Sequence, residues 1–364
     1  MLEFFNLQPE IFGMDLNDSS LKIAKLKKRR KGFVLESFNE VTIAPGVIKG
    51  GLIQNKEALT QVIQQACKKV IGKKLGTKHV IASLPEEKSF SQIIQMPKMT
   101  IEELKLAVPF EAENYIPLTI DNVYLDFETI NPIKNDENHL HVLINVMPKS
   151  IIDSYVDCFK KAGLIPHILE VESQSIARAL IKNGQVESPL VIIDLGISNT
   201  SLIIFFGGFI RFTASIPISS SQLTQAISDS LGVSVTDAEE LKVKHGLNKK
   251  GEQKYNIESA INPILSELVL QIKKYINFFY GHIPHEHSLS DIKIERIILC
   301  GGGANLKKLP AFLYKELKIP VELGNPFINI IRQKPGRADT LPYSKILSFT
   351  TVLGLALRGA NEEM

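Results

Sequence analysis

The sequence predicts an α/β protein with two related domains, and three observations support this prediction. Apolar runs of strand length alternate with segments of helical periodicity along most of the chain. The 364 residues exceed the ~100–200 residues that one domain core usually accommodates. A strand–turn–strand pattern near the start returns about half the chain later. A duplicated α/β architecture explains all three observations.

Composition and charge exclude several classes of protein. Hydrophobic residues make up 44% of the chain and charged residues 22%, which is typical of a globular protein and not of a disordered one. The 42 basic and 39 acidic residues leave a net charge of +3, too small to indicate nucleic acid as the main partner. Three widely separated cysteines argue against a disulfide framework or a zinc module and fit a reducing compartment.

Targeting signals are the next feature that the sequence can test. The first residues lack the basic region of a signal peptide. The longest apolar run, 202–210, has about half the length of a membrane span and contains two glycines. We therefore expect a soluble, cytoplasmic protein.

The first elements are three consecutive strands within 11–43, followed by a helix over 56–73. The basic turn Lys27-Lys28-Arg29-Arg30-Lys31-Gly32 joins the second strand to the third. Anionic lipid attracts such basic clusters, so a membrane-facing turn is one interpretation. A solvated hairpin tip is the simpler one, and we favour it.

Residues 79–165 have the pattern of a small inserted α+β unit. Strands are expected at 79–84 and 90–97, and a helix opens at Thr100, where Glu103 completes a capping box. Two further strands are expected near 124–130 and 141–147, followed by a helix near 150–162. An insertion of this size has its own strands and helices, so it can present a surface of its own.

From Ser188 the first pattern returns. Three strands lead into helices, a strand with a glycine turn and a final helix. The helices are expected near 221–231, 236–245, 259–280, 306–317 and 344–358. The resulting domain limits are 1–78 for the first domain, continued by about 166–187 and 343–364, with 79–165 as the insertion and 188–342 as the second domain.

The repeat is the most informative feature. The segment Asp15–Ile23 recurs as Asp194–Leu202, each time as an apolar strand ending in Asp, a small polar turn and a second strand. Turns rich in Gly, Ser and Thr expose N–H groups and hydroxyls that suit phosphate oxygens. An Asp at the strand end can hold Mg²⁺ through its waters. Two such hairpins facing each other across a cleft would grip the phosphates of a nucleotide.

A third turn, Gly301-Gly302-Gly303, follows an apolar strand and precedes a helical pattern. Glycine allows the backbone to approach a ligand without a Cβ clash, and the N-terminus of the next helix favours an anion. Three consecutive glycines are more than a plain loop requires. The turn is therefore a candidate ligand contact.

These turns together resemble the actin-like ATPase superfamily and, within it, the PilM family of type IV pilus assembly proteins, which is related to the division protein FtsA. The resemblance covers nearly the whole chain. Stretches typical of the family are FEAENYIP at 110–117, IPISSSQLTQAISDSLGVSVTDAEELKVKHGL at 216–247, ILCGGGANLKKLPAFL at 298–313 and VLGLALRG at 352–359. The implied fold is an actin-like ATPase fold, with two duplicated domains around a nucleotide cleft and an inserted, SHS2-like α+β subdomain.

The resemblance also implies roles for individual residues, with ATP and Mg²⁺ as the ligands. The first phosphate hairpin would comprise Asn17, Asp18, Ser19, Ser20, Leu21 and Lys22. The second would comprise Gly196, Ser198, Asn199 and Thr200. Asp15 and Asp194 would organise Mg²⁺, and Gly301, Gly302, Gly303 and Asn305 would back the adenosine. Glu239 would accept hydrogen bonds from the ribose, and the stem of Lys242 would pack on the adenine.

The sequence departs from the family pattern at two places that bear on hydrolysis. The first hairpin has Asn17-Asp18 where relatives carry Gly and then Ser or Thr, so Asp18 adds negative charge near the phosphates. The superfamily Glu-Pro motif falls at Glu172-Ser173 and lacks its proline. Glu172 is thus only a weak candidate for a catalytic residue, and slow or absent ATP hydrolysis is expected.

The function implied by the resemblance is a cytoplasmic ATP-binding scaffold of the type IV pilus inner-membrane complex. Its partner would be the N-terminal tail of a PilN-like membrane protein, bound through 79–165. Pilus motor ATPases and a second copy of the chain are further possible partners. Membrane association would be peripheral and through partners, without nucleic acid.

Two other functions stay open. An FtsA-like tether normally ends in an amphipathic helix, which the acidic stretch 358–364 does not resemble. A small-molecule kinase is the other alternative, but the sequence offers no candidate catalytic Asp for a sugar hydroxyl. We interpret the segment with histidines at 282, 285 and 287 as a solvated loop and not as a metal site. We interpret Cys300 as a packing residue and not as a nucleophile.

Overall fold

The computed structural model describes residues 9–130, 139–248, 256–282, 293–332 and 340–362. Contacts divide the chain into two compact units. Unit 1 contains 1–184, 326–341 and 349–364, and unit 2 contains 185–325 and 342–348. The predicted histidine loop and the polar turns after 130 and 248 lie mostly outside the described residues.

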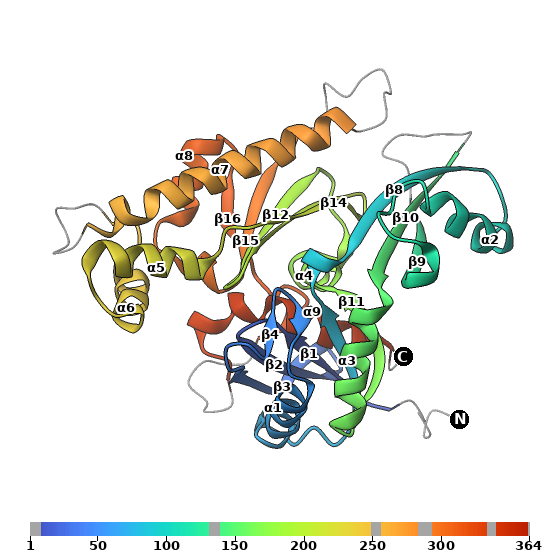
Figure 1. The fold of residues 1–364 in the computed structure, drawn as a ribbon, viewed down its shortest axis with the longest axis horizontal. Helices are drawn as coiled ribbons and strands as arrows, with labels where there is room; N and C mark the ends of the chain where they lie inside the picture. The colour runs from blue at the N-terminus through green and yellow to red at the C-terminus, as the bar shows by residue number, and fades with distance from the viewer. Residues whose placement is uncertain (1–8, 131–138, 249–255, 283–292, 333–339, 363–364) are drawn as a thin grey trace. The chain divides into compact units, whose positions relative to one another are not determined.

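Unit 1 is built on a seven-stranded sheet in the order β11-β7-β1-β2-β3-β17, with β6 paired to β3 (Figure 1). Strands β1, β2 and β3 are antiparallel neighbours, whereas β7 is parallel to both β1 and β11. The strands are β1 (Ile11–Leu16), β2 (Ser20–Arg29), β3 (Gly32–Thr42), β6 (Ile71–Gly72), β7 (His79–Leu84), β11 (Ile165–Val171) and β17 (Ile330–Ile331). A separate two-stranded hairpin follows β3 and consists of β4 (Ile48–Lys49) and β5 (Leu52–Ile53).

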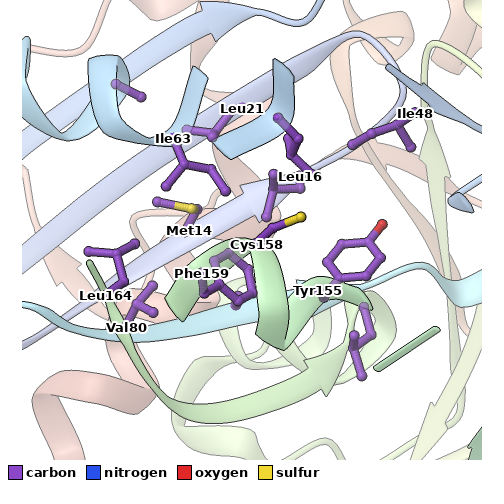
Figure 2. Close-up of a cluster of buried hydrophobic side chains, with 14 of the residues drawn as sticks. Met14, Leu16, Leu21, Ile48, Ile63, Val80, Tyr155, Cys158, Phe159 and Leu164 are labelled. Atoms are coloured by element: carbon purple, nitrogen blue, oxygen red, sulfur yellow. The ribbon is translucent and has the colours of Figure 1, made fainter. Parts of the chain in front are cut away.

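Helices cover both faces of this sheet. Side chains of β1 alternate, so that Phe12, Met14 and Leu16 enter the core under α1 (Lys56–Lys68) and α3 (Lys149–Lys161). Figure 2 shows Met14 and Leu16 among Tyr155, Cys158 and Phe159 of α3 and other members of this core. The opposite face is covered by α9 (Thr350–Glu362), which packs on α4 (Glu172–Leu180). Burial on both sides explains why β1 is apolar throughout.

The inserted unit forms its own three-stranded antiparallel sheet in the order β8-β10-β9, with α2 packed on it (Figure 1). Its elements are β8 (Phe90–Pro97), α2 (Ile101–Ala112), β9 (Val123–Ile130) and β10 (His139–Pro148). The structure confines it to narrower limits than 79–165. Strand β7 lies between β1 and β11 of the large sheet, and α3 contributes to the core of that sheet. The independent part therefore spans Phe90–Pro148.

Unit 2 repeats the topology of unit 1 around a five-stranded sheet in the order β14-β13-β12-β15-β16. Its strands are β12 (Leu190–Leu195), β13 (Thr200–Phe206), β14 (Phe209–Ile216), β15 (Arg296–Cys300) and β16 (Val321–Leu323). Strand β12 has an antiparallel neighbour on one side and the parallel β15 on the other, as β1 has β2 and β7. The helices are α5 (Ser220–Leu231), α6 (Val235–His245), α7 (Ile257–His282) and α8 (Leu309–Leu317). The predicted duplication of an α/β unit is confirmed.

Several helix boundaries differ from the sequence prediction for local reasons. The helix expected over 56–73 ends at Lys68, because the chain turns into β6 and Gly72 adopts a φ of 95°. The stretch after the glycine turn begins with a 3₁₀ turn, so α8 starts at Leu309. The last helix starts at Thr350, six residues later than expected, after two 3₁₀ turns.

We predict that Gly354→Ala unfolds unit 1. A Cβ at Gly354 would lie 2.5 Å from the carbonyl carbon of Ser175, so α9 could no longer pack on α4. The expected loss exceeds about 3 kcal/mol of unfolding free energy, measured by urea denaturation. Gly281→Ala near the end of α7 is the matched control, since nothing lies within 4 Å of its Cβ position. Equal stability of the two variants would contradict the close contact.

Candidate functional site

One side chain closes the turn between β1 and β2. Asn17 Oδ1 accepts hydrogen bonds from the backbone N–H of Ser19 at 3.0 Å and of Ser20 at 2.9 Å. The hydroxyls of the same two serines donate to it at 3.1 and 3.2 Å. Asn side chains commonly bond to the backbone of a turn in this way. Four donors that were predicted to bind phosphate therefore point at the Asn17 side-chain oxygen inside the turn. A ligand oxygen can take the place of that oxygen only if the Asn17 side chain rotates away.

Asp18 is directed to a neighbouring loop. Its Oδ2 accepts from the N–H of Gly50 at 2.7 Å, and its Oδ1 accepts from the N–H of Gly51 at 3.0 Å. Both glycines connect β4 to β5 with positive φ of 55° and 71°. Hydrogen bonds from two amides to a carboxylate are stronger than those between neutral groups. The negative charge next to the first hairpin is thus stabilised by this loop.

Asp15 at the end of β1 is buried and fully engaged. Its Oδ1 accepts from the hydroxyl of Ser83 on β7 at 2.9 Å, and its Oδ2 lies 3.5 Å from the ammonium of Lys22. Ser83 in turn accepts from the N–H of Leu16 at 3.2 Å, which fixes the orientation of the carboxylate. Lys22 also donates to the Ser20 hydroxyl at 3.0 Å. The side chain of Leu21 is fully buried in the core, so only its backbone belongs to the turn.

We predict that Asp18→Ala lowers stability by about 1–3 kcal/mol, because two loop amides lose a charged acceptor. Asp18→Asn should cost less, since an amide oxygen can still accept one of the two bonds. Urea denaturation of the three proteins measures the difference. The exposed Asp229 of α5 is the control, and Asp229→Ala should change stability by no more than about 0.5 kcal/mol. An unchanged midpoint for Asp18→Ala would contradict this role.

The second turn, between β12 and β13, is closed by the main chain. The N–H of Gly196 donates to the carbonyl of Asn199 at 3.0 Å, while the Gly196 carbonyl accepts from the N–H of Ser220 at 2.9 Å. Thr200 is buried, and its hydroxyl donates to the Ile218 carbonyl at 2.6 Å, which gives it a structural role. Ser198 is exposed at the tip. A ligand can approach this tip without displacing a side chain from the turn.

The three glycines after β15 differ in what surrounds them. A Cβ at Gly301 would lie 2.6 Å from the Leu195 carbonyl oxygen, and one at Gly303 would lie 2.5 Å from Leu195 Cγ. Both residues must therefore be glycine so that the turn can pack on β12. Gly302 is exposed, and the nearest atom to its Cβ position is 3.8 Å away. Asn305 closes the turn by donating to the carbonyl of Gly302 at 3.2 Å.

Lys242 of α6 is buried against α5. Its ammonium donates to the Ser220 hydroxyl at 2.8 Å and to the Thr224 hydroxyl at 2.7 Å, and it lies 2.7 Å from Glu239 Oε2. Burial lowers the pKa of Lys242 from its ordinary value, although Glu239 opposes this effect. Half of the Glu239 side chain stays exposed. The ammonium of Lys242 therefore holds Glu239, and packing of the Lys242 stem on a ligand stays a prediction.

Glu172 opens α4 and is paired with a second glutamate. Its Oε2 accepts from the N–H of Glu86 at 3.4 Å, and Oε2 of Glu86 accepts from the N–H of Ser173 at 3.1 Å. This reciprocal arrangement satisfies an N–H at the start of α4 and one in the loop after β7. Glu86 therefore satisfies an amide at the start of α4, while the Glu172 side chain is engaged by the loop after β7.

The two carboxylates predicted to organise Mg²⁺ lie in different units, Asp15 in unit 1 and Asp194 in unit 2. Asp194 lies at the end of β12, and its Oδ1 accepts from the thiol of Cys300 at 3.4 Å. Among the residues that the structure describes, no group of three or more His, Cys, Asp or Glu side chains could hold a metal ion. Mg²⁺ typically keeps several waters and takes one or two carboxylates together with substrate phosphates. The role of Asp15 and Asp194 as such carboxylates stays a prediction.

The residues that hold the predicted site side chains in place were not predicted from the sequence. Ser83 orients Asp15, the Gly50-Gly51 pair receives Asp18, and Thr224 helps to hold Lys242. The tandem glycines Gly50-Gly51 could have been recognised in the sequence as a tight turn. No sequence pattern indicates the contact of Ser83 with Asp15, because this contact depends on the parallel pairing of β7 with β1.

Comparison with known proteins identifies relatives over most of the chain. A family model described as type IV pilus assembly protein PilM matches residues 13–360. Among solved structures, a PilM-PilN type IV pilus biogenesis complex superposes with a TM-score of 0.80 at 25% identity, covering 96% of this chain and 98% of that one. MreB5 of Spiroplasma citri bound to ADP gives a TM-score of 0.60 at 13% identity, over 99% and 98% of the two chains. The fold is therefore the actin-like ATPase fold.

Curated relatives are cell division proteins. FtsA of Neisseria meningitidis is 18% identical over 232 residues, which are 60% of this chain and 54% of that protein. FtsA of Escherichia coli is 23% identical over 249 residues, 62% of this chain and 56% of that protein. The chain thus spans about half the length of the curated relatives that it matches. No helix among the described residues is long and apolar enough to span a membrane.

Proposed function

The chain belongs to the PilM family of type IV pilus assembly proteins, and on this premise we propose that it is an ATP-binding scaffold of a pilus or related secretion complex. The observation that carries the proposal is the pair of strand–turn–strand motifs, each with an Asp at the strand end and small polar residues in the turn. The scaffold would work in the cytoplasm, at the inner face of the membrane, through its partners.

ATP is the proposed ligand, with Mg²⁺ held by Asp15, Asp194 and the phosphates. The adenosine side would use Gly302, since it is the glycine of its turn that is exposed and has space at its Cβ position. Glu239 would accept from ribose hydroxyls, held in place by Lys242. Hydrolysis would be slow, because the Glu172 side chain is engaged by the loop after β7 and the Glu-Pro motif is incomplete.

We predict that Gly302→Val weakens ATP binding at least tenfold, because a branched side chain occupies the surface proposed to face the nucleoside. Isothermal titration calorimetry with Mg²⁺ and ATP measures the affinity, and repetition in EDTA measures the metal contribution. Asp194→Asn should abolish the difference between the two titrations. Ala311→Val on the exposed side of α8 is the control for an added side chain. Full affinity in Gly302→Val would contradict the assignment of the adenosine side.

The partner would be the N-terminal tail of a PilN-like membrane protein, bound by the inserted unit. Helix α2 buries Leu104, Val108 and Ala112 against its sheet, yet it also exposes Leu106 by 72% and Phe110 by 76%. The exposed pair is spaced i, i+4 and so forms one apolar stripe. Such a stripe on a small domain is typical of a peptide-binding surface.

We predict that Phe110→Ser lowers the affinity for a synthetic peptide of this tail at least tenfold, because the most exposed aromatic of the stripe is removed. Fluorescence anisotropy of a labelled peptide measures the affinity, and calorimetry should show unchanged ATP binding. The control is Tyr314→Ser, which removes an aromatic that is 55% exposed on α8. If Phe110→Ser retains the peptide fully, the tail binds elsewhere.

A further inference from the structure

The hairpin of β2 and β3 extends beyond β1 in the sheet of unit 1, and β17 pairs with β3 next to the tip. Strand β1 pairs with β2 only over Leu21–Ala24, whereas the β2–β3 ladder continues to the pair Arg29 and Gly32. Residues 28–31 at the tip are exposed, and all four are Lys or Arg. Ladder bonds therefore hold a row of basic residues at the end of a projecting hairpin.

Among the residues that the structure describes, no acid pairs with this tip, residues 28–31. Glu36 on β3 is surrounded by lysines instead, at 3.6 Å from Lys25, 3.9 Å from Lys27 and 3.6 Å from Lys73. Each exposed charge at the tip thus adds to a field that is already positive.

The positive charge of the chain is concentrated here. The hairpin group consists of Lys25, Lys27, Lys28, Arg29, Arg30, Lys31 and Lys73, with Glu10 and Glu36 as its acids. Its surplus of five positive charges exceeds the net +3 of the whole chain, so the remaining residues are net acidic. A hydrogen bond from Lys25, with further contributions from Lys27 and Lys73, lowers the pKa of Glu10 from its ordinary value.

Apolar side chains lie directly next to the charges. Phe33 and Val34 follow the tip and are half-buried, and they pair with the short strand β17. Ile331 of β17 is 39% exposed, and its Cδ1 lies 3.5 Å from the Cβ position of Gly32. Basic residues beside a small apolar surface suit the boundary between lipid head groups and acyl chains.

We propose that the β2–β3 hairpin tip binds the anionic lipid surface of the membrane directly. The choice of lipid as the polyanion rests on the proposed function, which puts the scaffold beside a membrane through its partner. In a basic cluster near anionic lipid, each Lys or Arg strengthens binding about fivefold. Nucleic acid is the less suitable polyanion, because the rest of the chain is net acidic and would be repelled by an extended one.

Co-flotation of the full chain with vesicles tests the proposal. Vesicles of phosphatidylcholine alone are compared with vesicles in which about a third of the lipid is the anionic phosphatidylglycerol. Wild type should float with the anionic vesicles, and raising salt from about 0.1 M to about 1 M should release it as the Debye length falls. Lys28→Gln, Arg29→Gln, Arg30→Gln and Lys31→Gln combined should lose at least tenfold of this binding.

The control removes four charges elsewhere, with Lys182→Gln, Lys244→Gln, Lys273→Gln and Lys315→Gln, all exposed in the structure. This control variant should float like wild type, because the proposal assigns binding to the charges at the hairpin tip and not to the net charge of the chain. The tip variant should retain ATP and the PilN-like peptide, and the control variant should retain ATP, so a failure here is distinct from a failure of the proposed function. The proposal is overturned if wild type ignores anionic vesicles, if the two variants behave alike, or if labelled duplex DNA displaces the protein from vesicles at equal phosphate concentration.

Discussion

The close approach of α9 to β1 is the contact on which the rest of unit 1 depends. A Cβ at Gly13 would lie 2.7 Å from the N–H nitrogen of Ala356, so only glycine allows the helix to rest on the strand. With α9 in place, β1 is buried on both faces and its position between β2 and β7 is fixed. The end of β1 then carries Asp15 and the Asn17 turn to a defined place. The position of that turn within unit 1 therefore depends on packing by residues far along the chain.

Polar side chains of the first strand–turn–strand motif and of α6 find partners within the protein. Asn17 collects the donors of its turn, Asp18 takes two loop amides, and Lys242 is held by α5. Buried or half-buried polar groups generally find such partners when no ligand is present. A ligand at the first turn must therefore exchange existing hydrogen bonds for its own, which reduces the net gain from binding. The second turn is closed by main-chain bonds and requires no such exchange.

The sequence predicted the α/β class and the duplication because both depend on local patterns. Each copy of the repeat has its own apolar strand, polar turn and second strand, so the pattern could be recognised without tertiary information. The limits of the insertion and the role of Lys242 could not be predicted in this way. Strand β7 joins the large sheet through long-range pairing with β1, and Lys242 is buried only because α6 packs on α5. Neither contact leaves a periodic signal in the sequence.

Unit 1 is completed by segments from the far end of the chain. Its sheet includes β17 at Ile330–Ile331, and its second face is covered by α9 at Thr350–Glu362. The sheet of unit 2 is complete in sequence once Leu323 has been made. During synthesis from the N-terminus, one face of β1 therefore stays uncovered until the strands of unit 2 and then α9 have been synthesised. The long sequence separation of these contacts also predicts slow folding of unit 1, and this interval is when chaperones would be needed.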